Sequence, residues 1–74
     1  MQEATVQIRV GQAIRARREA SGLSQERFAD TIEMHRAYYS KVERGERNLT
    51  LHTLCKVAAG LGVAPSIILA EAGA

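Results

Sequence analysis

The 74-residue sequence predicts one all-α domain, a compact bundle of five short helices spanning residues 1–74. Apolar residues recur at helical spacing, runs of alternating β-type residues are absent, and proline occurs once. Hydrophobic residues make up 46% of the chain and charged residues 24%, which excludes a disordered tail. A core of this size is marginal, so pairing with a second copy would help. We expect residues 1–5 and 71–74 to be loose.

The first predicted helix begins after Thr5, a possible N-cap, and ends at Ser21-Gly22. Its apolar stripe contains Val6, Val10, Ala13, Ile14 and Ala20. Arg17 falls on this stripe, where its aliphatic stem can cover the core while its guanidinium reaches solvent or phosphate. Gly11 inside a helix costs about 1 kcal/mol relative to alanine, which indicates close packing against a neighbouring element.

The stretch from Leu23 to Asn48 predicts two short helices joined by a tight turn. Ser24 caps the first, residues 25–32, whose apolar face is formed by Phe28, Ala29 and Ile32. The apolar pattern then restarts in a new phase over residues 36–44, and Gly45 provides the C-terminal glycine. In that second helix Tyr39 and Val42 face inward, and we expect the Tyr39 hydroxyl to reach an edge of the core.

Two further helices complete the predicted core. Leu49 anchors the loop 45–48, and Thr50 caps a helix over residues 51–61 that ends at Gly62. The face of this helix comprises Leu51, Leu54, Ala58 and Leu61. Pro65 begins the last helix, which runs to about Glu71.

The last helix carries the prediction of a homodimer. Ile67, Ile68 and Leu69 are consecutive, and three adjacent helical residues span about 200° of arc, more than one buried face covers. We therefore expect an apolar side chain, Ile67 foremost, to be exposed, and Ile67 and Ile68 to form a two-fold interface. The alternative is an isolated surface apolar residue, which is common.

The positive charge is concentrated in the first two thirds of the chain. The net charge is +2. Residues 36–47 hold Arg36, Lys41, Arg44 and Arg47 against Glu43 and Glu46, the first helix adds four arginines, and residues 50–74 are neutral. Cations on and beside the second of two helices joined by a short turn favour double-stranded DNA as the partner.

Other classes of protein have little support in the sequence. A single cysteine excludes an intrachain disulfide and fits a reducing compartment. No signal segment or membrane-length apolar run is visible, so we expect a cytoplasmic protein without a membrane partner. His52 and Cys55 could ligate one metal ion, but two ligands do not close a site. We expect a surface His52, a semi-buried Cys55, no cofactor, no metal and no catalytic residues, and hence no enzyme.

The motifs resemble those of one family. Leu23-Ser24-Gln25, Ala29, the run 40–45 (SKVERG), Leu54 and Leu61-Gly62-Val63 resemble the lambda-repressor/Cro-like (XRE) helix-turn-helix domains over residues 10–69. The run 35–51, HRAYYSKVERGERNLTL, is similar to that of the controller proteins of restriction-modification systems. Those are small homodimers that bind operators upstream of their own genes and act as activators and repressors. The resemblance implies the same compact five-helix fold, with the helix-turn-helix at the second and third helices.

The sequence departs from the family pattern at two positions. Glu33 stands where the turn usually carries glycine, and a positive φ there would cost roughly 1 kcal/mol, a cost that a different turn geometry would avoid. His35 stands where the reading helix usually has a small N-cap residue.

The start of a helix in the major groove presents side chains to base edges, and its far end meets the DNA backbone. We expect base contacts from Arg36, Ala37, Ser40 and Lys41. We expect backbone contacts from Gln25, His35, Tyr38, Arg44, Arg47 and Asn48. For each of these residues the alternative is a solvated surface side chain.

By the resemblance, Glu43 pairs with Arg18 and locks the reading helix onto the first helix. We therefore predict that Glu43→Ala destabilises the domain more than Arg44→Ala does.

The sequence leaves a second function open. An antitoxin-type or other protein-interaction module can use the same fold. Such a module would usually need an added arm or tail, which favours the DNA-binding regulator. Activation of transcription would additionally require contact with RNA polymerase, for which no residue is identified. The sequence does not reveal the operator, the direction of regulation or the target genes.

Overall fold

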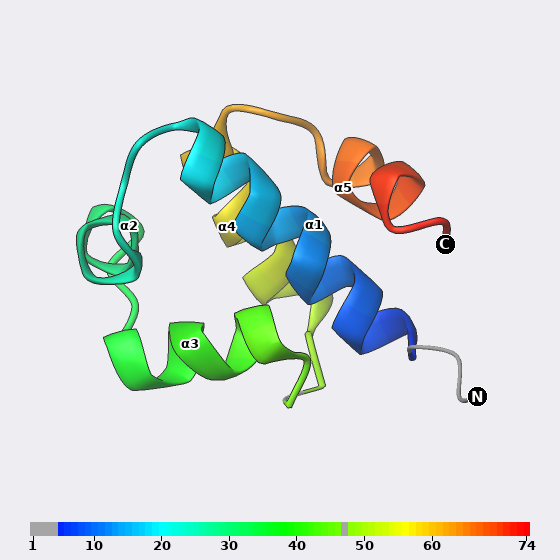
Figure 1. Cartoon of the computed structure of the whole chain (residues 1–74), viewed down its shortest axis with the longest axis horizontal. Helices are drawn as coiled ribbons and strands as arrows, with labels where there is room; N and C mark the ends of the chain where they lie inside the picture. The colour runs from blue at the N-terminus through cyan, green and yellow to red at the C-terminus, as the bar shows by residue number, and fades with distance from the viewer. Residues whose placement is uncertain (1–4, 47) are drawn as a thin grey trace.

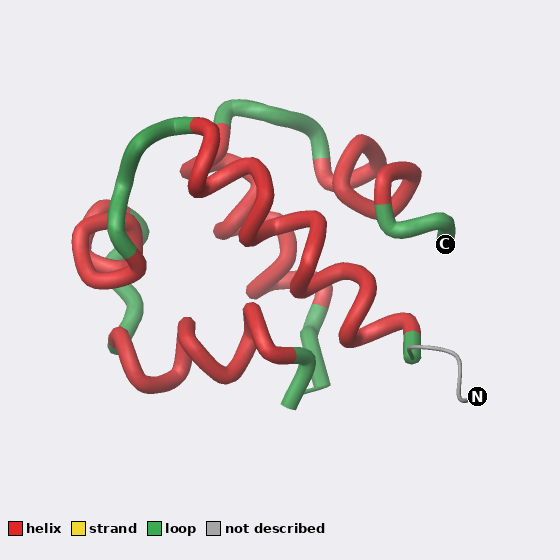
Figure 2. Tube along the Cα trace, in the orientation of Figure 1, coloured by secondary structure: helices red, strands yellow, loops and turns green. Residues whose placement is uncertain are grey.

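A computed structural model describes residues 5–46 and 48–74, and these residues form five helices and no strand (Figure 1). The helices are α1 (Val6–Ala20), α2 (Gln25–Thr31), α3 (Arg36–Arg44), α4 (Leu51–Leu61) and α5 (Pro65–Glu71). Short loops join them, as Figure 2 shows. The all-α fold and the helix positions are confirmed, except that α2 ends one residue earlier than predicted because Ile32 is its C-cap.

Small hydroxyl residues fix where three of the helices begin. The side chains of Thr5, Ser24 and Thr50 accept hydrogen bonds from the third backbone N–H that follows each of them, at 3.2, 3.1 and 3.1 Å. Each bond satisfies a donor that the first turn of a helix leaves without an intrahelical partner. Helix α3 begins differently, since His35 occupies its N-cap without a side-chain hydrogen bond.

One core receives side chains from all five helices, with α1 running diagonally across the molecule and α3 below it in Figure 1. At its centre the rings of Phe28 and Tyr39 lie 5.2 Å apart with an interplanar angle of 53°, so that α2 and α3 share an aromatic contact. The core residues are Val10, Ile14, Phe28, Ala29, Ile32, Tyr39, Val42, Leu54, Val57, Ala58, Ile68 and Ala72. The buried face of α3, with Tyr39 and Val42, therefore holds this helix against the core.

Glycine allows α1 to approach α3 closely. A Cβ atom at Gly11 would lie 2.3 Å from the carbonyl oxygen of Glu43, which is too close for any side chain. At the end of α3, Gly45 has φ 71° and packs so that a Cβ would lie 2.6 Å from the Cα of Ile8. The close packing predicted for Gly11 is confirmed.

The C-terminal segment, which we expect to be loose at residues 71–74, makes several contacts with the rest of the fold. The Arg17 guanidinium, on α1, donates to both carboxylate oxygens of Glu71 at 2.7 and 2.6 Å. Ala72 is buried, and the Ala74 N–H donates to the Leu69 carbonyl at 2.9 Å. Arg17 thus ties α1 to α5. At the other end, Thr5 is fixed as a cap, and the prediction for residues 1–4 lies outside the described residues.

Several apolar residues lie elsewhere than predicted. Ile68 is fully buried against the core, so it presents no interface, whereas Ile67 is 42% exposed. Leu51 is 79% exposed because it is the first residue of α4, and Val6 is 49% exposed at the start of α1. Ala20, at the far end of α1, is also exposed. A periodic stripe predicts which face is buried but not how far the core extends along it.

No single helix in the described part of the chain is both long and apolar enough to span a membrane. Helices α4 and α5 pass that test only as a pair, which is bent by 95°.

Candidate nucleic-acid interface

The turn between α2 and α3 is closed by backbone hydrogen bonds. The Glu33 N–H donates to the Asp30 carbonyl at 3.1 Å, and the Met34 N–H donates to the Ala29 carbonyl at 2.9 Å. This geometry requires a left-handed residue after the helix, and Glu33 has φ 54°. From α4, the Lys56 ammonium donates to the Glu33 carbonyl at 3.2 Å. Glu33 therefore adopts the positive φ considered from the sequence, and the hydrogen bond from Lys56 attaches the turn to α4.

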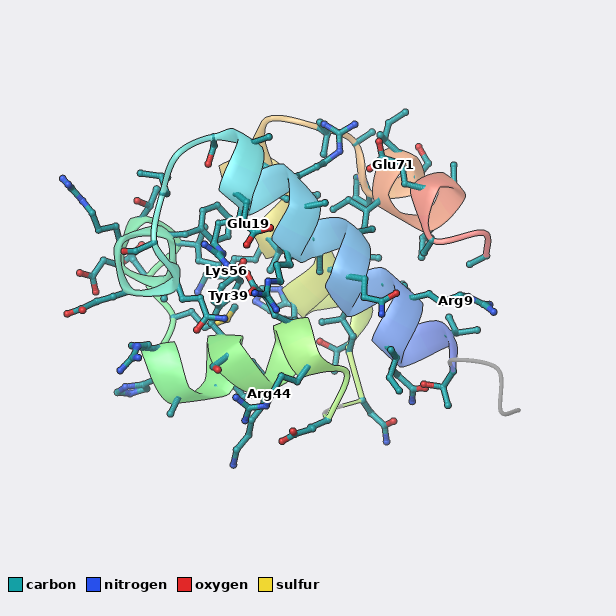
Figure 3. All side chains as sticks on the ribbon, viewed as in Figure 1. Arg9, Glu19, Tyr39, Arg44, Lys56 and Glu71 are labelled. Carbon is teal, nitrogen blue, oxygen red and sulfur yellow. The ribbon has the colours of Figure 1, made fainter. Side chains whose placement is uncertain are left out.

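Helix α3 has a buried face and an exposed face. Tyr39, Val42 and Glu43 are buried, and Tyr39 lies between α3 and α1 in Figure 3. Side chains of the opposite face line one surface hollow of about 320 Å³, formed by Arg36, Ala37, Ser40, Lys41 and Arg44. All residues predicted to contact bases therefore lie together on the solvent side. Three of the five are cations, which suits an anionic partner.

A buried ion pair joins α3 to α1. The Arg18 guanidinium donates to the two carboxylate oxygens of Glu43 at 2.6 and 3.2 Å, and to the Leu23 carbonyl at 2.8 Å. The Gln25 amide donates to the same carboxylate at 2.8 Å. The side chains of Arg18 and Glu43 are 9% and 1% exposed. The bidentate pair implied by the resemblance is present and connects α1, α2 and α3.

Burial and hydrogen bonding act in opposite directions on Glu43. Burial raises the pKa of its carboxyl group, but the hydrogen bonds that Arg18 and Gln25 donate hold the pKa below the ordinary value of 4.5. Burial also raises the pKa of Tyr39, and the adjacent Glu43 carboxylate raises it further. Tyr39 is fully buried beside the ion pair, so the prediction that its hydroxyl reaches an edge is wrong.

The residues predicted to contact the DNA backbone are in different situations. His35 is exposed and Tyr38 is half-buried. Arg44 is exposed and its guanidinium bonds to Glu46. Asn48 is exposed in the loop after α3, and Arg47 lies outside the described residues. The Gln25 amide, which we expect to hold phosphate, donates to the Glu43 carboxylate at 2.8 Å.

Two residues at this surface were missed by sequence reasoning. The Gln7 amide on α1 donates to the Asn48 side-chain oxygen at 2.7 Å, across 41 residues of sequence. The Glu46 carboxylate accepts two hydrogen bonds from the Arg44 guanidinium, at 2.7 and 3.2 Å. A contact as distant as that of Gln7 has no sequence signal, whereas the alternating charges of residues 43–47 could have indicated the Glu46 pair.

The pair considered as metal ligands lies on the surface of α4. His52 is exposed as predicted, but Cys55 is exposed rather than semi-buried, because it points away from the face that carries Leu54 and Val57. No group of three or more metal-binding side chains occurs among the residues that the structure describes.

Known proteins share this arrangement. A helix-turn-helix family model matches residues 14–68. The control protein C.MunI of a Mycoplasma species is 42% identical over 67 residues, covering 89% of this chain and 90% of that protein. The restriction-modification controller protein C.AhdI of Aeromonas hydrophila has a TM-score of 0.79 at 39% identity, covering 82% and 92% of the two chains. The C.Esp1396I controller tetramer, solved with its natural 35 base-pair operator, has a TM-score of 0.81 at 29% identity, covering 97% and 100%.

The fold and the exposed cationic face of α3 define a small helical DNA-binding protein. The chain belongs to the helix-turn-helix family, of the XRE type, which is a family of DNA-binding regulators and not of enzymes. Restriction-modification controller proteins are among its relatives, which confirms the resemblance seen in the sequence.

Proposed function

We propose that this protein is a sequence-specific transcription regulator that binds a palindromic operator as a homodimer and controls its own gene together with a restriction-modification system. The observation that supports this most is the hollow on α3, where Arg36, Ala37, Ser40 and Lys41 lie together on a helix whose opposite face is buried. Side chains at the start of such a helix reach base edges in the major groove.

Each residue of the hollow has a role that its chemistry suits. Arg36, in the first turn, forms a bidentate contact with O6 and N7 of a guanine, and Ala37 packs against a thymine methyl group. Ser40 and Lys41, one turn further on, reach the next base edges. Around them His35, Tyr38, Arg44, Arg47 and Asn48 contact phosphates, which sets the register without reading sequence.

The homodimer forms through the apolar surface that the monomer leaves exposed. Ile67 on α5 is one part of it. A second part is a hollow of about 220 Å³ whose apolar lining includes Val6, Leu51 and Leu69, from α1, α4 and α5. Covering these side chains with a second copy would supply apolar burial that a domain of this size needs. The two reading helices would then meet half-sites about one helical turn apart, roughly 34–36 Å, or a multiple.

The test of sequence reading compares Arg36→Ala with Arg15→Ala. Arg15 is an exposed arginine on α1, so its loss changes net charge equally without touching the hollow. With DNA from upstream of the protein's own gene, Arg36→Ala should lower the preference for operator over scrambled duplex by about 1–3 kcal/mol per half-site. Arg15→Ala should leave that preference unchanged. Equal losses for both variants would contradict the assignment.

The direction of regulation is a separate question that transcription in vitro answers. Activation would require the bound dimer to contact RNA polymerase, and purified polymerase on the operator-containing promoter is sufficient to detect it. If the protein binds the operator but only lowers transcript levels, regulation is by repression alone.

A further inference from the structure

We propose that the Glu46 carboxylate competes with DNA phosphate for the guanidinium of Arg44. It occupies the edge of Arg44 that would bind phosphate and thereby limits the affinity of the protein for DNA. This inference rests on the proposed function, because it assigns Arg44 to a phosphate contact. It concerns a residue that sets binding strength rather than one that reads bases.

The geometry of the pair matches the one that a phosphate would use. Arg44 Nε donates to one Glu46 oxygen at 2.7 Å and Nη2 donates to the other at 3.2 Å. This edge of the guanidinium is a planar fork that binds carboxylate and phosphate oxygens alike. Arg44 Nη1 donates to the Ser40 hydroxyl oxygen at 2.8 Å. A phosphate can take the fork only by displacing Glu46.

The position of Glu46 is imposed by the backbone. Gly45 adopts the left-handed conformation, and the Glu46 N–H then donates to the Lys41 carbonyl at 3.0 Å. This closing turn places residue 46 directly beside the last turn of α3. The Glu46 carboxylate is therefore presented to Arg44 by a fixed turn and not by a freely moving loop.

Helix stability does not explain an acidic residue at this point. The C-terminus of a helix carries partial negative charge, which favours cations and disfavours a carboxylate. The pair is also half-exposed, with side chains 52% and 53% accessible, so it contributes little to folding. Glu46 also lines a surface hollow beside Tyr38 and Asn48, both proposed phosphate contacts. Its carboxylate thus lies among the groups that would meet the DNA backbone.

The test measures binding of Glu46→Gln to operator and to scrambled duplex at low salt. Glutamine keeps the shape of the side chain but removes its charge. Breaking an exposed ion pair changes binding by up to about fivefold per protomer, so a dimer should gain up to about 25-fold on both duplexes. The gain should shrink as salt screens the pair. The control is Glu19→Gln, which frees Arg15 from an exposed pair on α1 and should change affinity less than about twofold.

A double-mutant cycle isolates the role of Arg44. In the Arg44→Gln background, Glu46→Gln should no longer raise affinity appreciably. An equal gain in both backgrounds would mean that Glu46 acts by general repulsion, and that result would overturn the proposal, as would a loss of affinity in Glu46→Gln alone. Failure of the proposed function looks different, because wild-type protein would then bind operator and scrambled duplex equally while the cycle remained measurable on either.

Discussion

Replacing Glu43 by alanine would leave the Arg18 guanidinium buried without its carboxylate partner. Arg18 is only 9% exposed, and the Gln25 amide would lose its acceptor as well. Removing one member of a buried ion pair costs about 3–5 kcal/mol. We expect about 3 kcal/mol, at the low end of this range, because Arg18 retains its bond to the Leu23 carbonyl at 2.8 Å.

The comparison is Arg44→Ala, a variant on the same helix whose ion pair is half-exposed. Loss of the Arg44–Glu46 ion pair should lower the free energy of unfolding far less than loss of the Arg18–Glu43 pair does. For a domain of this size, 3 kcal/mol corresponds to a fall in Tm of roughly 12–24 °C. Thermal and urea unfolding followed by circular dichroism, at one fixed protomer concentration, measure both variants.

A second variant separates loss of the pair from exposure of an unpaired charge. Replacing both partners by apolar residues, Arg18→Met with Glu43→Leu, should recover most of the stability that Glu43→Ala loses. A fall in Tm for Arg44→Ala as large as that for Glu43→Ala, or a cost of less than about 1 kcal/mol for Glu43→Ala, would contradict a stabilising role of the buried pair.

Three further predictions concern the same framework. Because the pKa of the Glu43 carboxyl group is lowered in the folded state, its contribution to stability is present above the unfolded pKa near 4.5 and is lost as pH falls through the folded pKa. The difference in urea midpoint between wild type and Glu43→Gln should therefore shrink from pH 7 to pH 3. A constant difference would contradict this. Glu33→Gly relieves the left-handed strain at φ 54° and should raise stability by about 0.5–1 kcal/mol, whereas a lower Tm would show that Glu33 makes a compensating contact. Gly11→Ala should destabilise by more than about 2 kcal/mol, despite the higher helix propensity of alanine, because its Cβ would meet the Glu43 carbonyl; the exposed neighbour Gln12→Ala serves as the neutral control in the same melting experiment.

The helices were predictable because their signals are local. Hydroxyl caps at Thr5, Ser24 and Thr50, and glycines at positions 45 and 62, act within one turn of the helix they bound. The exposed face of α3 followed from the same periodicity, since Tyr39 and Val42 had to point inward. The Arg18–Glu43 pair came from the family resemblance and not from these local signals.

The features that could not be predicted from the sequence depend on how the helices pack against one another. The burial of Ile68 and the exposure of Leu51 are set by where α5 and α4 cross the core, which periodicity does not specify. The commitment of Gln25 to Glu43 and of Gln7 to Asn48 depends on distances between separate helices. The Arg17–Glu71 ion pair likewise joins two helices that are far apart in the sequence.

A salt titration of DNA binding would show whether α3 reads DNA sequence. Operator DNA from upstream of the protein's own gene is compared with a scrambled duplex of the same length and composition. We expect a preference of about 10³ or more for the operator at physiological salt, with a two-fold footprint. Weak binding to both duplexes, equally steep in salt, would show contact with phosphates alone and would favour a protein-interaction module instead.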